Sequence, residues 1–215
     1  MTIALLTHSF PPDPAAVGQH MADLATALAK KGHDVTVITS DRGYDDPTMQ
    51  FARRELTANG VRIERRRFTS FGKATFVHRG IAIVSFMLQA SLTLGRIERL
   101  DGIVFSTSPP FIGVVATIIS KLRRVPTAFW AMDLNPHQLV ALGNLRQNGI
   151  LTRLMRSLNR FTLRNAGLVV ALDTYMAARL AVDGARANRL IVVHPWAPDE
   201  ALHPVARNAN SFRER

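Results

Sequence analysis

Residues 2–39, TIALLTHSFPPDPAAVGQHMADLATALAKKGHDVTVIT, contain two buried-strand patterns on either side of one amphipathic helix pattern. Thr2–Thr7 and Val35–Thr39 are short runs of apolar residues and threonines. Between them, Ala15–Lys31 places apolar residues at three- and four-residue spacing, and Gly32 suits the position after a helix end. This βαβ pattern predicts two parallel strands joined by a right-handed crossover.

The alternation of strand and helix patterns continues to residue 193. Further strands are predicted at Val61–Arg66, Gly102–Ser106, Thr127–Ala131, Leu168–Leu172 and Leu190–Val193. Further helices are predicted at Arg79–Leu100, Pro109–Leu122, Ile150–Asn165 and Thr174–Asp183, and a short one at His137–Leu142. The polar segments 40–60 and 67–78 are predicted to be surface loops. The pattern therefore predicts an α/β fold with a doubly wound, mostly parallel, Rossmann-like sheet.

The composition limits the classes of partner. The 215 residues carry a net charge of +11, which favours nucleic acid, an anionic membrane surface or phosphorylated substrates. No zinc-finger spacing, aromatic RNA-binding pair or basic zipper is present, so no nucleic-acid partner is expected. The absence of cysteine excludes disulfides and thiolate metal sites, and no metal is expected. The opening MTIALLTHSF lacks the features of a signal peptide, which favours a cytoplasmic location.

The loop after the first strand is the first candidate site. Ligands of open α/β sheets bind at the carboxyl ends of the strands, and this loop lacks the GxGxxG pattern of a dinucleotide site. Gly18 lies near a helix amino terminus, where backbone can approach an anion closely. We expect Pro12, Gly18, Gln19 and His20 to contact substrate. The alternative is that this proline-rich loop only connects the strand to the helix.

Two other loops contain candidate substrate contacts. Ser108 follows a predicted strand and is either a ligand contact or the amino-terminal cap of a helix opened by Pro109. Trp196 follows the last predicted strand and is interpreted as a hinge or ligand contact. The alternative for Trp196 is an ordinary buried tryptophan at a strand end.

The stretch 129–137, FWAMDLNPH, is the strongest candidate for catalysis. The end of a predicted strand is followed within five residues by the carboxylate of Asp133, the amide of Asn135 and the imidazole of His137. Asp133 is the predicted catalytic residue, as a base or a ligand anchor, and Trp130 and Asn135 are predicted substrate contacts. The alternative is that Asp133 or Asn135 caps the short helix that Pro136 opens.

Two features suggest a membrane surface. Residues 80–95 contain no charge, but the run is shorter than the ~20 apolar residues of a membrane-spanning helix, which predicts a buried or interfacial helix. Four arginines fall on one face of the predicted helix 150–165 and are expected to contact an anionic membrane surface: Arg153, Arg156, Arg160 and Arg164. The alternative is a solvated basic face.

These stretches together resemble the start of glycosyltransferase family 4 enzymes, which have the GT-B fold. The resemblance covers residues 1–204 and follows the order of several short stretches. They are Phe10-Pro11-Pro12, Gly18, Ala29–His33, Asp34–Ile38, Ser108–Pro110, Asp133–Pro136, Ala171–Asp173 and His194–Ala197. Many family members have two adjacent glycines where this chain has Val17 and Gly18.

The resemblance implies a retaining, metal-independent transfer of a sugar from a nucleotide sugar. It implies that residues 1–204 form the amino-terminal, acceptor-binding domain, with Gly18 against the donor diphosphate and Asp133 near the donor sugar. It also implies that 205–215 begin a carboxy-terminal, nucleotide-binding domain that carries paired glutamates. A chain without that second domain is expected to be inactive alone.

The leading hypothesis is therefore the amino-terminal domain of a hexosyltransferase for polysaccharide biosynthesis. The acceptor is expected to be lipid-linked, such as a polyprenyl-diphosphate sugar, or a cell-surface polysaccharide, and the enzyme to be peripheral on the inner face of the membrane. The alternative is a non-catalytic module that binds a glycan, a diphosphate or a membrane. A nucleotide-dependent epimerase or reductase is a third, weaker hypothesis, because the GxGxxG pattern is missing.

Overall fold

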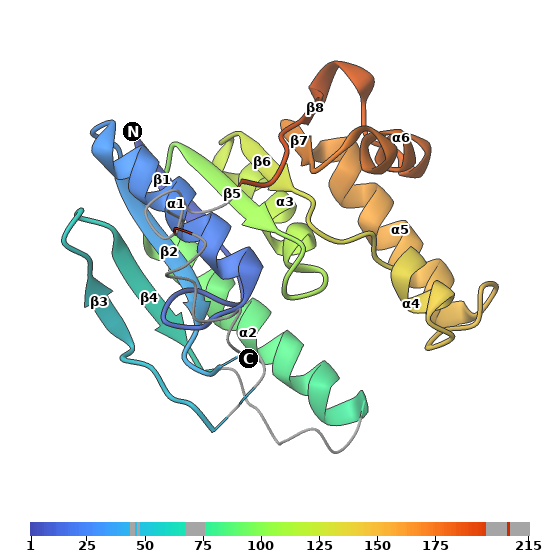
Figure 1. Ribbon diagram of the computed structural model, residues 1–215, viewed down its shortest axis with the longest axis horizontal. Helices are drawn as coiled ribbons and strands as arrows, with labels where there is room; N and C mark the ends of the chain where they lie inside the picture. Colours follow the sequence, from blue (N-terminus) through green and yellow to red (C-terminus); the bar gives the residue numbers. More distant parts are fainter. Residues whose placement is uncertain (44–45, 47, 68–75, 197–205, 207–215) are drawn as a thin grey trace.

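The computed structural model describes residues 1–43, 46, 48–67, 76–196 and 206. They contain one eight-stranded sheet with the strand order β3-β4-β2-β1-β5-β6-β7-β8 (Figure 1). The strands are β1 Thr2–Leu6, β2 Asp34–Ser40, β3 Arg54–Leu56, β4 Arg62–Arg66, β5 Gly102–Ser106, β6 Thr127–Trp130, β7 Leu168–Ala171 and β8 Leu190–Val192. All neighbours are parallel except β3, which pairs antiparallel with β4 at the edge. The predicted α/β, mostly parallel sheet is confirmed.

Helices cover both faces of this sheet, as a doubly wound fold requires (Figure 1). They are α1 Ala16–Lys30, α2 Phe76–Arg96, α3 Ile112–Arg123, α4 His137–Ala141, α5 Ile150–Asn165, α6 Thr174–Asp183 and the 3-10 turn η1 Ala187–Arg189. Successive side chains of a strand point to opposite faces. Accordingly, Leu5 of β1 packs in a cluster with Met21 of α1. Its neighbour Leu6 packs in a second cluster with residues of α2, α3, α5 and α6.

The first βαβ unit forms as its sequence predicts. Met21 and Ala25 are buried on the sheet-facing side of α1, one turn apart. Gly32 has a φ of +81°, a left-handed conformation that favours glycine, and the N–H of His33 donates to the carbonyl of Leu28 at 3.1 Å. This turn ends α1 and returns the chain to β2 in register with β1.

The structure differs from the prediction in segment 40–60 and at the ends of α2. Segment 40–60 contains the short strand β3, whose three residues are all exposed, so no burial pattern marks it in the sequence. Helix α2 begins at Phe76 and ends at Arg96, rather than spanning Arg79–Leu100. The Arg123 guanidinium of α3 donates to the carbonyls of Gly95, Ile97 and Glu98, which satisfies the acceptors where α2 ends.

Two predicted features lie largely outside the described residues. Residues 68–75 hold most of the predicted loop 67–78, and 205–215 form the predicted start of a second domain, of which only Ala206 is described. The proposed boundary at residue 204 therefore stays a prediction.

Candidate active site

The loops at the carboxyl ends of the central strands are tied together at His8, directly after β1. The His8 N–H donates to the carbonyl of Ser108, in the loop after β5, at 2.8 Å. The His8 carbonyl accepts from the N–H of Ser40 at 3.1 Å and from the Thr39 hydroxyl at 2.9 Å. Loops from three strands thus meet at one rim of the sheet.

A buried arginine holds the loop between β1 and α1, here called the first loop. Arg65 of β4 is completely buried, and its guanidinium donates to the Pro11 carbonyl at 2.6 Å and to the Glu55 carboxylate at 2.7 Å. Of the predicted substrate contacts, Pro12 and Gln19 are exposed on this loop, and the Gln19 amide donates to the Pro14 carbonyl at 3.1 Å. The backbone of this loop is therefore held in place by Arg65, and the side chains of Pro12 and Gln19 lie on its exposed surface.

Gly18 is needed by the loop's own packing. A Cβ atom at this position would lie 2.9 Å from the backbone carbon and oxygen of Ser9 and 3.0 Å from the Phe10 nitrogen. Only glycine allows the first loop to lie this close to the first turn of α1. The residue is buried, and the predicted contact with a donor diphosphate stays a prediction.

Asp133, the predicted catalytic residue, lies in the loop after β6 and is oriented by Thr107. The Thr107 hydroxyl, in the loop after β5, donates to Asp133 Oδ2 at 3.0 Å. Asp133 and Asn135 border a pocket between the ends of β5 and β6, the start of α3 and helix α5. Most other lining residues are apolar: Pro109, Pro110, Phe111, Ile112, Val114, Phe129, Pro136, Met155 and Leu158. A carboxylate at the edge of a mostly apolar pocket is a typical ligand site.

The capping alternatives for these loops are wrong. Helix α3 begins at Ile112, not at Pro109, and its preceding residue Phe111 has a left-handed φ of +69°. Ser108 therefore lies outside the helix end and uses its carbonyl to accept from His8. Helix α4 is preceded by Pro136 and has no side-chain cap, so neither Asp133 nor Asn135 caps it.

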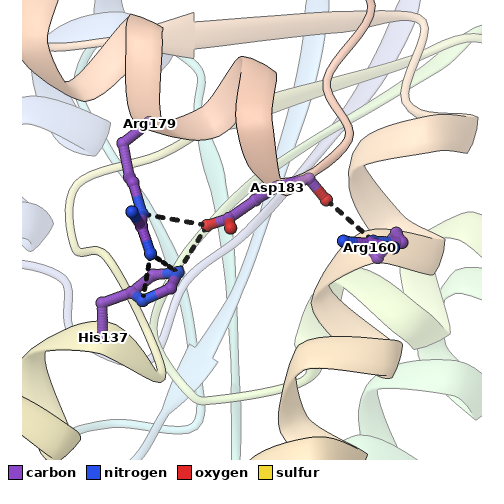
Figure 2. Close-up of polar contacts among 4 residues, drawn as sticks. All are labelled: His137, Arg160, Arg179 and Asp183. Atoms are coloured by element: carbon purple, nitrogen blue, oxygen red, sulfur yellow. Dashed lines mark hydrogen bonds and ion pairs between the residues drawn. The ribbon is translucent and has the colours of Figure 1, made fainter.

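Helix α4, and with it the Asp133–Pro136 loop, is fixed by the polar cluster shown in Figure 2. His137 Nε2 lies 2.7 Å from Asp183 Oδ2 of α6, and Arg179 NH2 lies 2.8 Å from His137 Nδ1. Arginine only donates, so Nδ1 must accept and Nε2–H donates to the carboxylate. Arg160 of α5 also donates to the Asp183 carbonyl at 3.3 Å.

Three other predicted site residues form a separate aromatic cluster on the α1 side of the sheet. Trp196 stacks on Trp130 with ring centroids 5.5 Å apart, and its ring lies 5.0 Å from that of His20. The Trp196 indole N–H donates to Asp23 of α1 at 2.9 Å. Trp196 is 39% exposed, so the buried-tryptophan alternative is wrong. Trp130 and Trp196 do not line the pocket beside Asp133.

The rim histidine is held neutral. Burial lowers the pKa of His8 from 6.5 to about 4, although the nearby Asp13 carboxylate raises it. Its ring also contacts Phe86 of α2 edge-on, with centroids 6.2 Å apart. His8 is therefore a neutral structural link between the first loop and α2 at ordinary pH.

The four arginines of α5 differ in how far they are exposed. Arg153, Arg160 and Arg164 are exposed, and Arg156 is half-buried. Leu154 of the same helix is exposed as well. In the described part of the chain, no helix is long and apolar enough to cross a membrane. The same residues contain no group of three histidines or carboxylates that could hold a metal ion.

Sequence reasoning missed three residues that hold the site: His8, Arg65 and Thr107. Thr107 carries a local signal, because it follows a strand in the same way as Asp133. From the sequence, Arg65 is expected to add to a basic surface for membrane contact, together with Arg62, Arg66 and Arg67. That expectation is wrong for Arg65, which is buried on the same side of β4 as Ile63.

The sequence profile of the family described as "Glycosyl transferase 4-like domain" matches residues 15–196. The chain belongs to this family. A curated relative, "Probable glycosyltransferase WbjE" from Pseudomonas aeruginosa, is 24% identical over 148 residues. That match covers 68% of this chain and 37% of the relative. The sequence resemblance to family 4 is thereby confirmed.

Solved glycosyltransferase structures have the same fold. Sucrose-phosphate synthase from Thermosynechococcus elongatus matches with a TM-score of 0.66 at 16% identity, over 95% of this chain and 50% of that one. Anabaena HepE, in complex with UDP and glucose, gives 0.55 at 17% identity, over 90% and 44%. Starch synthase IV from Arabidopsis thaliana, bound to ADP and acarbose, gives 0.61 at 12% identity, over 96% and 53%. This glycosyltransferase domain therefore has a GT-B Rossmann-like fold and spans about half of each structure.

Proposed function

We propose that this chain is the acceptor-binding half of a retaining, metal-independent hexosyltransferase. The observation that carries the proposal is the Asp133 carboxylate, oriented by Thr107 at the edge of a mostly apolar pocket. Oδ2 accepts from Thr107, and Oδ1 has no partner among the described residues. Oδ1 is therefore free to accept a hydrogen bond from a sugar hydroxyl, which would position that group for transfer.

The pocket beside Asp133 supports an acceptor with an apolar part. Proline, phenylalanine, methionine, leucine, isoleucine and valine residues make up most of its lining. The polar lining residues are Ser106, Thr107, Asp133, Asn135, Asn159 and Thr162. A lipid-linked sugar, such as one on a polyprenyl diphosphate, has both an apolar part and polar groups that such a lining could contact. We propose such a lipid-linked or cell-surface polysaccharide acceptor on the inner face of the membrane.

The donor is proposed to be a nucleotide sugar held by a carboxy-terminal domain. UDP- and ADP-sugars are the first to test, because structures of this fold have been solved with UDP and with ADP. The exposed loop residues Pro12 and Gln19 border the same rim as Ser108 and are proposed to face that domain.

The test uses the full-length protein and a radiolabelled donor. Asp133→Asn should lower kcat/KM by about 10–10²-fold, because it replaces the charged acceptor of the hydrogen bond with a neutral amide. Asp101→Asn is the matched control, since Asp101 lies at the opposite end of the sheet, where its carboxylate accepts from the Thr2 N–H. Equal effects of the two substitutions would remove Asp133 from the site.

The finer parts of the proposal are tested separately. The anomeric configuration of the product, read by NMR, should be that of the donor, and inversion would contradict a retaining enzyme. Activity should survive EDTA if no metal takes part. Transfer to a soluble acceptor together with failure on every polyprenyl-diphosphate sugar would overturn the lipid-linked acceptor.

A further inference from the structure

The outer surface of helices α2, α3 and α5, named here the basic helical face, is unlike the rest of the molecule. These helices lie side by side on one face of the sheet, where α3 contacts both α2 and α5 (Figure 1). Their sequences contain no aspartate and no glutamate. They contain these lysines and arginines: Arg79, Arg96, Lys121, Arg123, Arg153, Arg156, Arg160 and Arg164.

The basic helical face also exposes aliphatic side chains. Along α2, Ile81, Val84, Leu88 and Leu92 form one line on the side opposite buried Phe86, and Leu88 is 62% exposed. The same face continues through exposed side chains of α3 and α5: Ile118, Leu122, Ile150, Leu151 and Leu154. A helix that faces only water normally has polar residues on that side.

Exposed basic residues lie beside two parts of this aliphatic line. The amide of Gln89, one residue from Leu88, donates to the carbonyl of the exposed Arg67 at 2.7 Å. Beyond Leu92, the last residue of the aliphatic line, Arg96 is exposed next to the site where Arg123 binds the last carbonyls of α2. None of the described basic side chains of the three helices forms an ion pair with a carboxylate.

We propose that the basic helical face docks on an anionic lipid leaflet. Exposed aliphatic side chains and exposed cations, on three helices that contain no acidic residue, match the acyl and headgroup layers of such a surface. A second copy of this chain would bring like charges together. The segment that follows β8 turns to the opposite side, where Trp196 binds Asp23 of α1.

Docking by this face would place the candidate active site beside the membrane. Gln89 contacts Arg67 just after the end of β4, so the part of α2 before Gln89 extends past the carboxyl edge of the sheet (Figure 1). Ile81 and Val84 lie on this extension, on the same edge as the Asp133 pocket. The inference deepens the proposed function by naming the surface that would bring a lipid-linked acceptor to the rim.

The experiment is sedimentation of the full 215-residue chain with two kinds of vesicle. One kind is phosphatidylcholine alone, and the other is phosphatidylcholine mixed with phosphatidylglycerol. The chain should bind only the mixed vesicles, and added salt should weaken the binding. Arg153→Gln/Arg164→Gln should reduce the affinity about tenfold or more. Lys30→Gln/Lys31→Gln, with the same charge change at the far end of α1, should leave it unchanged.

The aliphatic contribution has its own variant. Leu88→Gln/Leu92→Gln keeps every charge and should weaken vesicle binding with an unchanged unfolding midpoint, because both side chains are exposed. Equal loss in the α1 lysine variant would overturn the face-specific docking. A dimer in light scattering that this leucine variant dissociates, without vesicle binding, would assign the face to self-association instead.

Sugar transfer by the full-length protein separates this inference from the proposed function. The leucine variant should keep its rate on a water-soluble acceptor and lose it on an acceptor embedded in vesicles. Vesicle binding without transfer to any acceptor would leave the docking face standing and overturn the transferase proposal. Sugar transfer without vesicle binding would support the transferase proposal and overturn the docking face.

Discussion

The two faces of the sheet differ in how completely the chain covers its own apolar surface. On one side, α1 buries Met21 and Ala25, and its outer surface carries one aspartate, which Trp196 binds. On the other side, α2 buries Phe86 with equal completeness and yet exposes a line of aliphatic residues. Truncation of a buried side chain on the α1 side should therefore change stability, whereas truncation of an exposed aliphatic side chain of α2 should change only what the domain binds.

The largest difference is expected for a pair of truncations. Met21→Ala on α1 should lower the free energy of unfolding by about 2–5 kcal/mol, because the side chain is fully buried and leaves a cavity. Leu88→Ala on α2 should change it by less than about 0.5 kcal/mol, since that side chain is mostly in water. Urea unfolding of both variants measures the pair. A cost above 2 kcal/mol for Leu88→Ala would show that this face is covered by protein.

The next effect is pH-dependent and concerns His8, where the first loop contacts α2. Its pKa is lowered to about 4 in the folded chain, so the unfolded state binds more protons between pH 4 and 6.5. The full stabilisation is present above pH 6.5 and is lost as the pH falls toward 4. The shift corresponds to about 3 kcal/mol at most.

Urea unfolding of the wild type and of His8→Gln across this pH range isolates the histidine. Aspartates and glutamates titrate in both proteins, so their contribution is removed by subtraction. The difference in unfolding free energy should change with pH between 4 and 6.5 and be constant above that. A constant difference throughout would show that His8 is not buried as a neutral ring.

Alanine substitutions at two glycines should have smaller effects on stability, and the two effects should have opposite signs. Gly18→Ala should destabilise by about 1–3 kcal/mol, because its Cβ would overlap the Ser9 backbone, which cannot move as a flexible side chain can. Gly95→Ala in α2 meets no atom within 4 Å and should stabilise by about 0.5–1 kcal/mol. Thermal unfolding measures both, and a stabilised Gly18→Ala would contradict the close packing of the first loop.

The sequence predicts most of the fold because its signals are local. The spacing of Met21 and Ala25, the position of Gly32 and the apolar strands each depend on neighbours within one turn or strand. The same reasoning finds the rim, since parallel strands bring their carboxyl ends to one edge. It places Asp133 correctly in the loop after a strand, beside a pocket that also includes Asn135.

The rest of the site depends on contacts between distant residues. His137 meets Asp183 across 46 positions, and Trp196 meets Asp23 across 173, so no local pattern indicates either pair. The wrong capping predictions have the same origin. The Ser108 side chain is of a type that caps helices, but α3 begins only at Ile112, after Phe111. The Ser108 carbonyl instead accepts from the N–H of His8, which lies 100 positions earlier in the chain.

The smallest predicted effect tests how firmly the segment after β8 is held on the α1 side. Trp196→Phe keeps an aromatic ring over Trp130 but removes the hydrogen bond to Asp23, so it should cost about 1 kcal/mol at most, because the site is partly exposed. The chain has only two tryptophans, so the stacked pair should dominate the near-ultraviolet circular dichroism, and the variant should lose most of that signal. Asp23→Asn keeps both rings and an acceptor oxygen, and it should preserve the spectrum. A wild-type spectrum in Trp196→Phe would mean that the two indoles do not stack in solution and that the segment after β8 is free to leave α1.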